Sequence, residues 1–135
     1  MTTLDDFTRG YIECALWAET CWYEEDQSDD RSFQDHGYDE TDLAPETLSA
    51  MIEECADFQH YNAADLEEYA ERKEDHPDYS ALACAGHDFW LTRNGHGTGF
   101  WDRGLGEVGE RLTRAAKVYG SRDLYLGDDG LIYQQ

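Results

Sequence analysis

Four side chains that could transfer protons lie within residues 86–104 of the sequence. They are His87, Asp88, His96 and Asp102. A histidine next to a carboxylate is a common general base, because the carboxylate orients the imidazole and stabilises its charged form, and such pairs also occur in metal sites. Two strands joined by the glycine-rich turn 94–99 would bring His87 and Asp88 opposite Asp102. The predicted hairpin is therefore a candidate catalytic or ligand-binding site.

The same segment also has a purely structural explanation. Trp90 and Trp101 suit a core that packs across two strands, and a tight turn needs the glycines. No serine or cysteine nucleophile stands in an activating motif, and the glycine turn leads into a predicted strand, which makes it a poor phosphate-binding loop. We therefore expect a scaffold here and keep the His/Asp site as the alternative.

The cysteines form no metal-binding pattern. Cys14, Cys21, Cys55 and Cys84 make no C-x-x-C pair and have no zinc-site spacing. Three of them fall within apolar helical patterns, so we expect small buried core residues rather than ligands or disulfides. The sequence predicts neither a metal nor a cofactor.

The chain is strongly acidic, and the acidity is confined to one half of it. The formal net charge is −21 for 135 residues, of which residues 1–78 carry −20 and residues 79–135 carry −1. Such a charge repels nucleic-acid phosphates and anionic lipid headgroups, and it attracts basic proteins. Direct binding to nucleic acid or to a membrane is therefore disfavoured, and a basic protein partner is favoured.

Periodic apolar residues predict four helices and one shorter one. The four cover residues 4–22, 44–59, 63–72 and 105–119, and the short one covers 81–85 and ends at Gly86. Residues 23–42 contain two acidic runs and are predicted to form a long irregular loop.

The remaining segments predict two hairpins and complete a fold of class α+β. Their strands cover residues 88–93 with 100–102, and 123–126 with 131–133. We expect a single domain over 1–135, with N-terminal helices packed on a small antiparallel sheet of two hairpins and one intervening helix. Residues 1–78 would be its acidic helical part, and residues 79–135 its near-neutral hairpin–helix–hairpin part.

The candidate partner-binding surface lies on the second and third predicted helices. Its carboxylates are Glu46, Glu53, Glu54, Asp57, Glu67, Glu68, Glu71 and Glu74. Duplex DNA carries one charge about every 1.7 Å of its axis, and closely spaced carboxylates can imitate that row in the Lys/Arg groove of a nucleic-acid-binding protein. There are two simpler alternatives. One is a solvated face that keeps the protein soluble, and the other is salt adaptation, which should acidify the whole surface.

Several segments resemble small, largely uncharacterised acidic proteins encoded by bacteriophages and mobile elements. They are residues 7–17, 43–58, 86–104 and 124–130. The resemblance implies an accessory protein made inside a bacterium, and it carries over no site residues. Small acidic phage proteins often counter restriction enzymes or CRISPR complexes by mimicking nucleic acid, so it also suggests such an inhibitor by analogy.

These observations predict a non-enzymatic protein that binds a basic, nucleic-acid-binding host protein, as a DNA or RNA mimic. Residues 1–7 contain two aspartates and no basic run, and no stretch reaches membrane-spanning length, so we expect the host cytoplasm. Two alternatives stay open. One is an enzyme or ligand-binding protein that uses the hairpin 87–102, and the other is a soluble regulator whose acidity is incidental.

Overall fold

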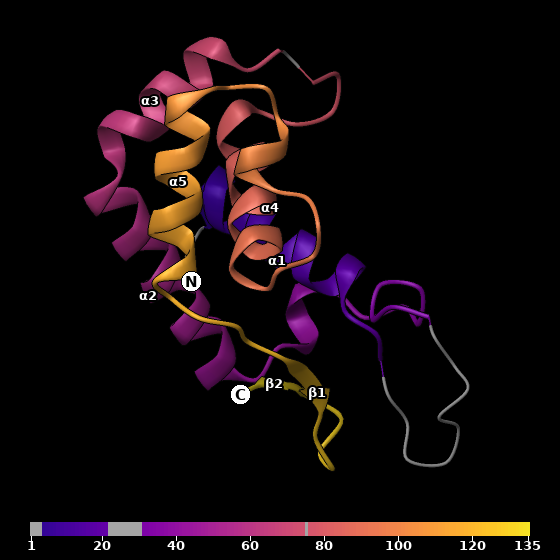
Figure 1. The fold of residues 1–135 in the computed structure, drawn as a ribbon. Helices are drawn as coiled ribbons and strands as arrows, with labels where there is room; N and C mark the ends of the chain where they lie inside the picture. Colours follow the sequence, from indigo (N-terminus) through magenta and orange to yellow (C-terminus); the bar gives the residue numbers. More distant parts are fainter. Residues whose placement is uncertain (1–3, 22–30, 75) are drawn as a thin grey trace.

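The computed structural model describes residues 4–21, 31–74 and 76–135 (Figure 1). These residues form helices α1 (Asp6–Ala18), α2 (Pro45–Tyr61), α3 (Ala63–Arg72), α4 (Ala81–Arg93) and α5 (Glu107–Lys117), strands β1 (Leu124–Leu126) and β2 (Ile132–Gln134), and short 3-10 turns η1 (Glu40–Asp42) and η2 (Phe100–Asp102). The protein is mostly helical with a small two-stranded antiparallel sheet, consistent with the predicted α+β class.

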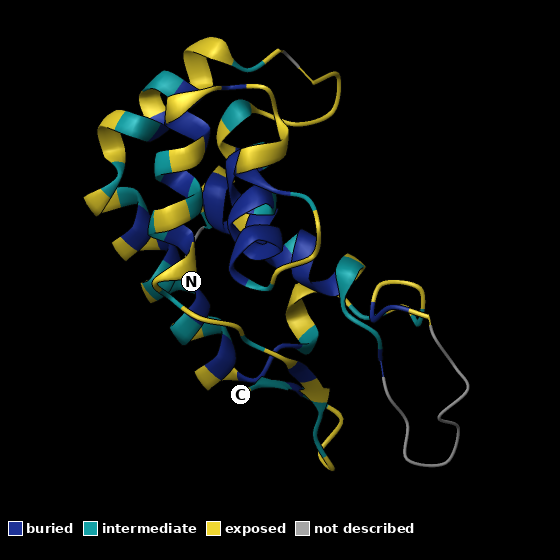
Figure 2. Ribbon diagram, viewed as in Figure 1, coloured by how far each residue is buried: buried dark blue, intermediate teal, exposed yellow. Residues whose placement is uncertain are grey.

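Helices α1 and α4 pack directly against each other in the middle of the molecule (Figures 1 and 2). Two glycines make this possible. A Cβ atom on Gly86 would lie 2.0 Å from the carbonyl oxygen of Phe7, and one on Gly10 would lie 2.2 Å from that of Ala83. The two helix backbones are therefore in contact, with no room for a side chain between them.

An aromatic core surrounds this helix pair. The rings of Phe58 and Phe89 stack with centroids 4.2 Å apart, and the ring of Phe100 lies nearly parallel to that of Phe58 with centroids 5.9 Å apart. Helix α2 supplies Phe58 and packs against α1, whereas α5 packs against α3 and α4. Burial of these rings contributes strongly to the stability of the fold.

The first predicted hairpin is wrong. Residues 88–93 belong to α4, which begins at an N-cap where the Ser80 hydroxyl accepts a hydrogen bond from the Ala83 amide, and residues 100–102 form η2. Helix α4 is buried on nearly all sides, so it lacks the apolar stripe by which an amphipathic helix is recognised. Gly86 does not end the helix but provides its contact with α1.

The tryptophans of this segment differ from each other. The Trp90 side chain is fully buried and its indole N–H donates to Glu19 Oε1 at 3.1 Å, whereas Trp101 is half exposed. The prediction of a buried residue is confirmed for Trp90 and wrong for Trp101, because no pair of strands places the two rings together.

Strands β1 and β2 lie within one residue of the ranges predicted for the last hairpin. Their antiparallel register pairs Leu124 with Gln134 and Leu126 with Ile132, and a turn over 127–130 joins them. The carbonyl of Ile132 also accepts from the amide of Ala44 at 2.9 Å, which ties the start of α2 to the sheet.

Other boundaries differ by a few residues from those predicted. Helix α1 ends at Ala18, four residues early, because the chain turns extended at Glu19 and Thr20 forms a bridge with Ser32. Residues 22–30 of the predicted loop lie outside the described residues, and residues 31–42 contain η1 and the buried Phe33.

The burial of the cysteines predicts unequal thiol reactivity. Cys14, Cys21 and Cys55 are buried, and Cys84 is half-buried. Burial raises the pKa of Cys14 to about 12, and it raises that of Cys55 well above its usual value. Because the thiolate is the reactive form, we expect one fast-reacting thiol with a disulfide reagent in the native protein and three at least about a hundredfold slower. The variant Cys84→Ser should lose the fast phase, and a persistent fast phase would contradict the buried positions.

Candidate functional site

The predicted His/Asp residues do not form one catalytic group, since the hairpin that would have joined them is absent. Asp88 is 1% exposed, and its carboxylate accepts hydrogen bonds from Arg103 Nη2 at 2.6 Å and from the Tyr69 hydroxyl at 2.8 Å. Hydrogen bonding to Asp88 raises the pKa of Arg103, and burial raises that of Tyr69. Asp88 is therefore the buried half of an ion pair.

His96 and Asp102 lie apart from Asp88 and have partners of their own. In the loop after α4, His96 Nε2 lies 2.9 Å from Glu19 Oε1. Asp102 ends η2 and accepts a hydrogen bond from the Thr98 hydroxyl at 3.0 Å. Both contacts stabilise the loop over 94–102, and neither aims at a common reacting atom.

His87 faces a small pocket. Its Nε2 atom is buried and has no hydrogen-bond partner among the described residues. Burial lowers the pKa of His87, so the imidazole is neutral near pH 7. The pocket has a volume of about 190 Å³, and its lining includes Lys73, His76, Tyr79 and Arg103. These residues come from the end of α3, the segment before α4 and the segment after η2.

The sequence did not indicate this pocket. Its only local signal is the His87–Asp88 dipeptide, which the strand prediction directed towards Asp102. The ring of Tyr79 contacts that of His87 in a tilted arrangement, with ring centroids 5.2 Å apart, and this contact depends on how the segment before α4 folds back along that helix.

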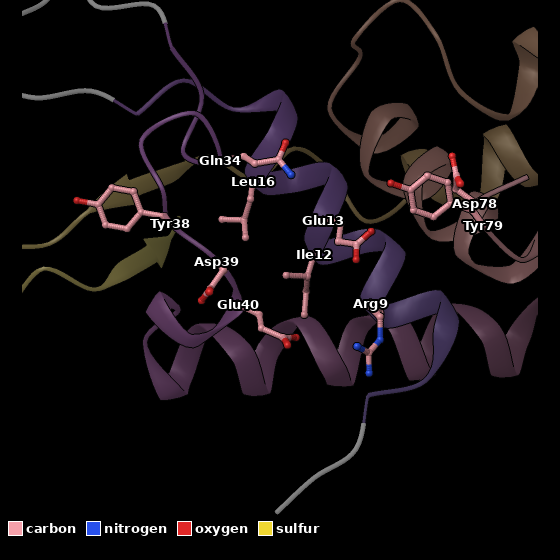
Figure 3. A pocket seen from close by; sticks show the side chains of 10 residues that line it. All are labelled: Arg9, Ile12, Glu13, Leu16, Gln34, Tyr38, Asp39, Glu40, Asp78 and Tyr79. Carbon is pink, nitrogen blue, oxygen red and sulfur yellow. The ribbon is translucent and has the colours of Figure 1, made fainter.

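A second hollow, of about 390 Å³, lies over the outer face of α1 (Figure 3). Ile12 and Leu16 form its apolar floor. The charged residues that line it are one arginine and four acidic residues: Arg9, Glu13, Asp39, Glu40 and Asp78. This hollow therefore combines an apolar floor with an acidic rim.

Two of the eight predicted partner-binding carboxylates are held in ion pairs. Glu54 Oε2 lies 2.6 Å from Arg93 Nη1, and the Arg93 side chain is fully buried. Glu68 lies 3.7 Å from Arg72 and 3.6 Å from Arg111. These two carboxylates stabilise helix packing, so they are poor choices for mutations meant to spare the fold.

The other six carboxylates are exposed and have no ion-pair partner within the part of the chain that the structure describes. They are Glu46, Glu53, Asp57, Glu67, Glu71 and Glu74. The first three share one face of α2, and Glu67 and Glu71 share one face of α3. Both helices lie along one edge of the molecule (Figures 1 and 2). Carboxylates four residues apart are separated by about 6 Å along a helix, so the edge carries closely spaced negative charge.

Comparison with protein-family models, curated proteins and solved structures finds no match for this chain. Within residues 4–21, 31–74 and 76–135, no three His, Cys, Asp or Glu side chains are grouped as metal ligands. The helices described are too short or too polar to cross a lipid bilayer. The geometry and charge of the surface therefore carry the functional argument.

Proposed function

We propose that the protein binds a basic, nucleic-acid-binding protein without catalysing a reaction, and that the exposed faces of α2 and α3 form the contact surface. The six carboxylates without an ion-pair partner among the described residues carry the proposal; five lie on these faces, and Glu74 lies just beyond the end of α3. Like charges held close together oppose folding, and they contribute to stability only when a cation approaches. A groove rich in lysine and arginine supplies such cations, and nucleic acid would compete for it.

The hollow over α1 supports a basic partner. Its apolar floor, Ile12 and Leu16, suits the methylene stem of a lysine or arginine side chain. Carboxylates at the rim, such as Glu13 and Glu40, suit the charged end of that side chain, since charge-assisted hydrogen bonds are the strong ones. The partner would therefore contact both the α2–α3 edge and α1.

The resemblance to phage accessory proteins supports a setting in the cytoplasm of a bacterial host. The partner would then belong to a defence system, such as a restriction enzyme or a CRISPR complex, and the protein would inhibit it by occupying its nucleic-acid groove. Catalysis by His87, Asp88, His96 and Asp102 gains no support from geometry, because these residues lie in separate contacts.

Neutralising part of the acidic edge should weaken binding. The partner is isolated by cross-linking in a bacterial lysate and purified, and its binding to labelled duplex DNA is measured with this protein as competitor. The triple variant Glu53→Gln, Glu67→Gln, Glu71→Gln should compete about tenfold or more less well, because each charge pair contributes up to about 1 kcal/mol. Raising the salt concentration should also weaken competition, because screening shortens to about 8 Å near 0.15 M.

A matched control separates local contact from overall charge. The triple variant Glu110→Gln, Asp123→Asn, Asp128→Asn removes three exposed carboxylates elsewhere, so both variants have the same net charge. The control should compete within about twofold of the unmodified protein. Equal losses in both variants would indicate incidental acidity, and unchanged competition by the first would exclude the α2–α3 edge.

A further inference from the structure

The pocket beside His87 is the place where basic groups with unused donors converge. Lys73 lines it and forms no ion pair with any described residue, although the chain is strongly acidic. Arg103 holds Asp88 through Nε and Nη2, which leaves Nη1 without a hydrogen bond in the described structure. Asp88 offsets one of these two charges, so the described lining keeps one positive charge in excess before any charge on the histidines is counted.

A third hollow on the surface also contains basic side chains, but its charges are balanced. Arg72 and Arg111 line it, and both guanidinium groups lie within ion-pair distance of Glu68. Arg111 also donates to Asp65 at 3.0 Å. The two positive charges of that hollow are therefore offset by the carboxylates of Glu68 and Glu107 in its own lining, whereas the charge of Lys73 is not offset by a described carboxylate of the pocket beside His87.

The histidines add donors to the same pocket. The amide of Asp78 donates to His76 Nδ1 at 3.0 Å, so in the neutral ring the proton lies on Nε2. His87 Nε2 is buried without a partner, and a buried polar atom of this kind normally has one. A buried polar atom without a partner destabilises the protein, and a hydrogen bond from a ligand to this nitrogen would offset that loss.

We propose that this pocket binds a small oxyanion, namely a phosphate group, free or as the end group of a small phosphomonoester. The volume of about 190 Å³ lies below the 300–1,000 Å³ typical of pockets for drug-sized ligands, so only a small group fits. Lysine supplies a point charge for phosphate, and the guanidinium of arginine supplies a planar set of donors. The proposal does not depend on the proposed function.

Calorimetric titration with inorganic phosphate, in a chloride buffer of constant ionic strength, tests the site. We expect one site per chain. Lys73→Gln should weaken it about tenfold or more, and so should His87→Phe, which keeps a ring against Tyr79 but removes both nitrogens. The matched control is Lys117→Gln, because Lys117 is the only other lysine and is exposed on α5. Circular dichroism of each variant verifies the fold.

Sulfate provides the pH arm of the experiment, because its charge is constant between about pH 5 and 8 while histidine titrates there. The titratable groups that line the pocket together with His87 are Lys73, His76, Tyr79, Cys84, Asp88 and Arg103. A bound anion favours the protonated form of His87, so sulfate should bind more tightly as the pH falls, and His87→Phe should reduce this dependence.

The remaining outcomes decide the proposal and the source of the phosphate. A small phosphomonoester that binds more tightly than inorganic phosphate identifies an ester as the ligand, whereas weaker binding identifies the free anion. Absence of phosphate binding would overturn the proposal. Equal weakening by Lys73→Gln and Lys117→Gln would also overturn it, since it would show a general charge effect.

Discussion

Replacement of Gly86 by alanine is expected to lower the free energy of unfolding by about 3 kcal/mol or more. In an exposed helix the same change stabilises, because alanine is the better helix former by about 1 kcal/mol. At this position the new Cβ would lie 2.0 Å from the carbonyl oxygen of Phe7 and 2.7 Å from the amide nitrogen of Tyr11. Both are backbone atoms of α1, so the helices must move apart and loosen the aromatic core.

Urea unfolding followed by circular dichroism measures this effect. The control is the reverse exchange at an exposed position of α3, Ala64→Gly, which should cost about 1 kcal/mol through backbone entropy alone. The protein with alanine should thus be less stable than the one with glycine at position 86, and more stable at position 64. A Gly86→Ala protein as stable as the unmodified one would show that α1 and α4 are not in backbone contact.

The sequence predicts the amphipathic helices well and the buried helix poorly. Helix α3 matches its predicted range, and the ends of α2 differ from the predicted ones by only one or two residues. Both helices were predictable because each has one buried face and one solvated face. Helix α4 has no such alternation. Its aromatic and β-branched residues, such as Phe89, Trp90 and Thr92, favour strands locally, and the contact of Gly86 with α1 overrides that preference.

For the acidic surface, the sequence predicts which residues are charged but not which are neutralised. Glu53 and Glu54 are adjacent, yet Glu53 is exposed and Glu54 binds Arg93, which lies 39 residues further along the chain. Only the packing of α2 against the end of α4 decides that difference. The pocket beside His87 is hidden for the same reason, since Lys73 and Arg103 come together through tertiary contacts.

Arg93 is the buried cation on which several elements depend. Its guanidinium donates to the carbonyl oxygens of Gly120 at 2.8 Å and Tyr119 at 2.9 Å, just beyond the end of α5. It also donates to the Tyr11 hydroxyl at 3.0 Å and to Glu54 at 2.6 Å. A cation at this position provides donors to two carbonyl groups of the chain that leaves α5, and it complements the dipole at that end of the helix.

Arg93→Met is therefore expected to lower the free energy of unfolding by about 3–5 kcal/mol, the usual cost of removing one partner from a buried ion pair. The methionine fills much of the space but leaves two carbonyl oxygens without their donor, and it leaves Glu54 with only its longer contact to Arg122, at 3.4 Å. Arg93→Lys should also destabilise, because an ammonium group cannot reach all four acceptors in the geometry of a guanidinium. The control is Arg114→Met, an exposed arginine of α5 with no ion pair in the described structure, expected within about 0.5 kcal/mol of the unmodified protein.

A double-mutant cycle separates the ion pair from the rest of this network. Removing Glu54 as well, in Arg93→Met with Glu54→Gln, should cost less than the sum of the two single changes, because the second loses a partner already absent. The residual loss then measures the contacts of Arg93 with Tyr11 and the end of α5. Strictly additive losses in urea unfolding would contradict a direct Arg93–Glu54 interaction, and equal stability of Arg93→Met and Arg114→Met would contradict the burial of Arg93.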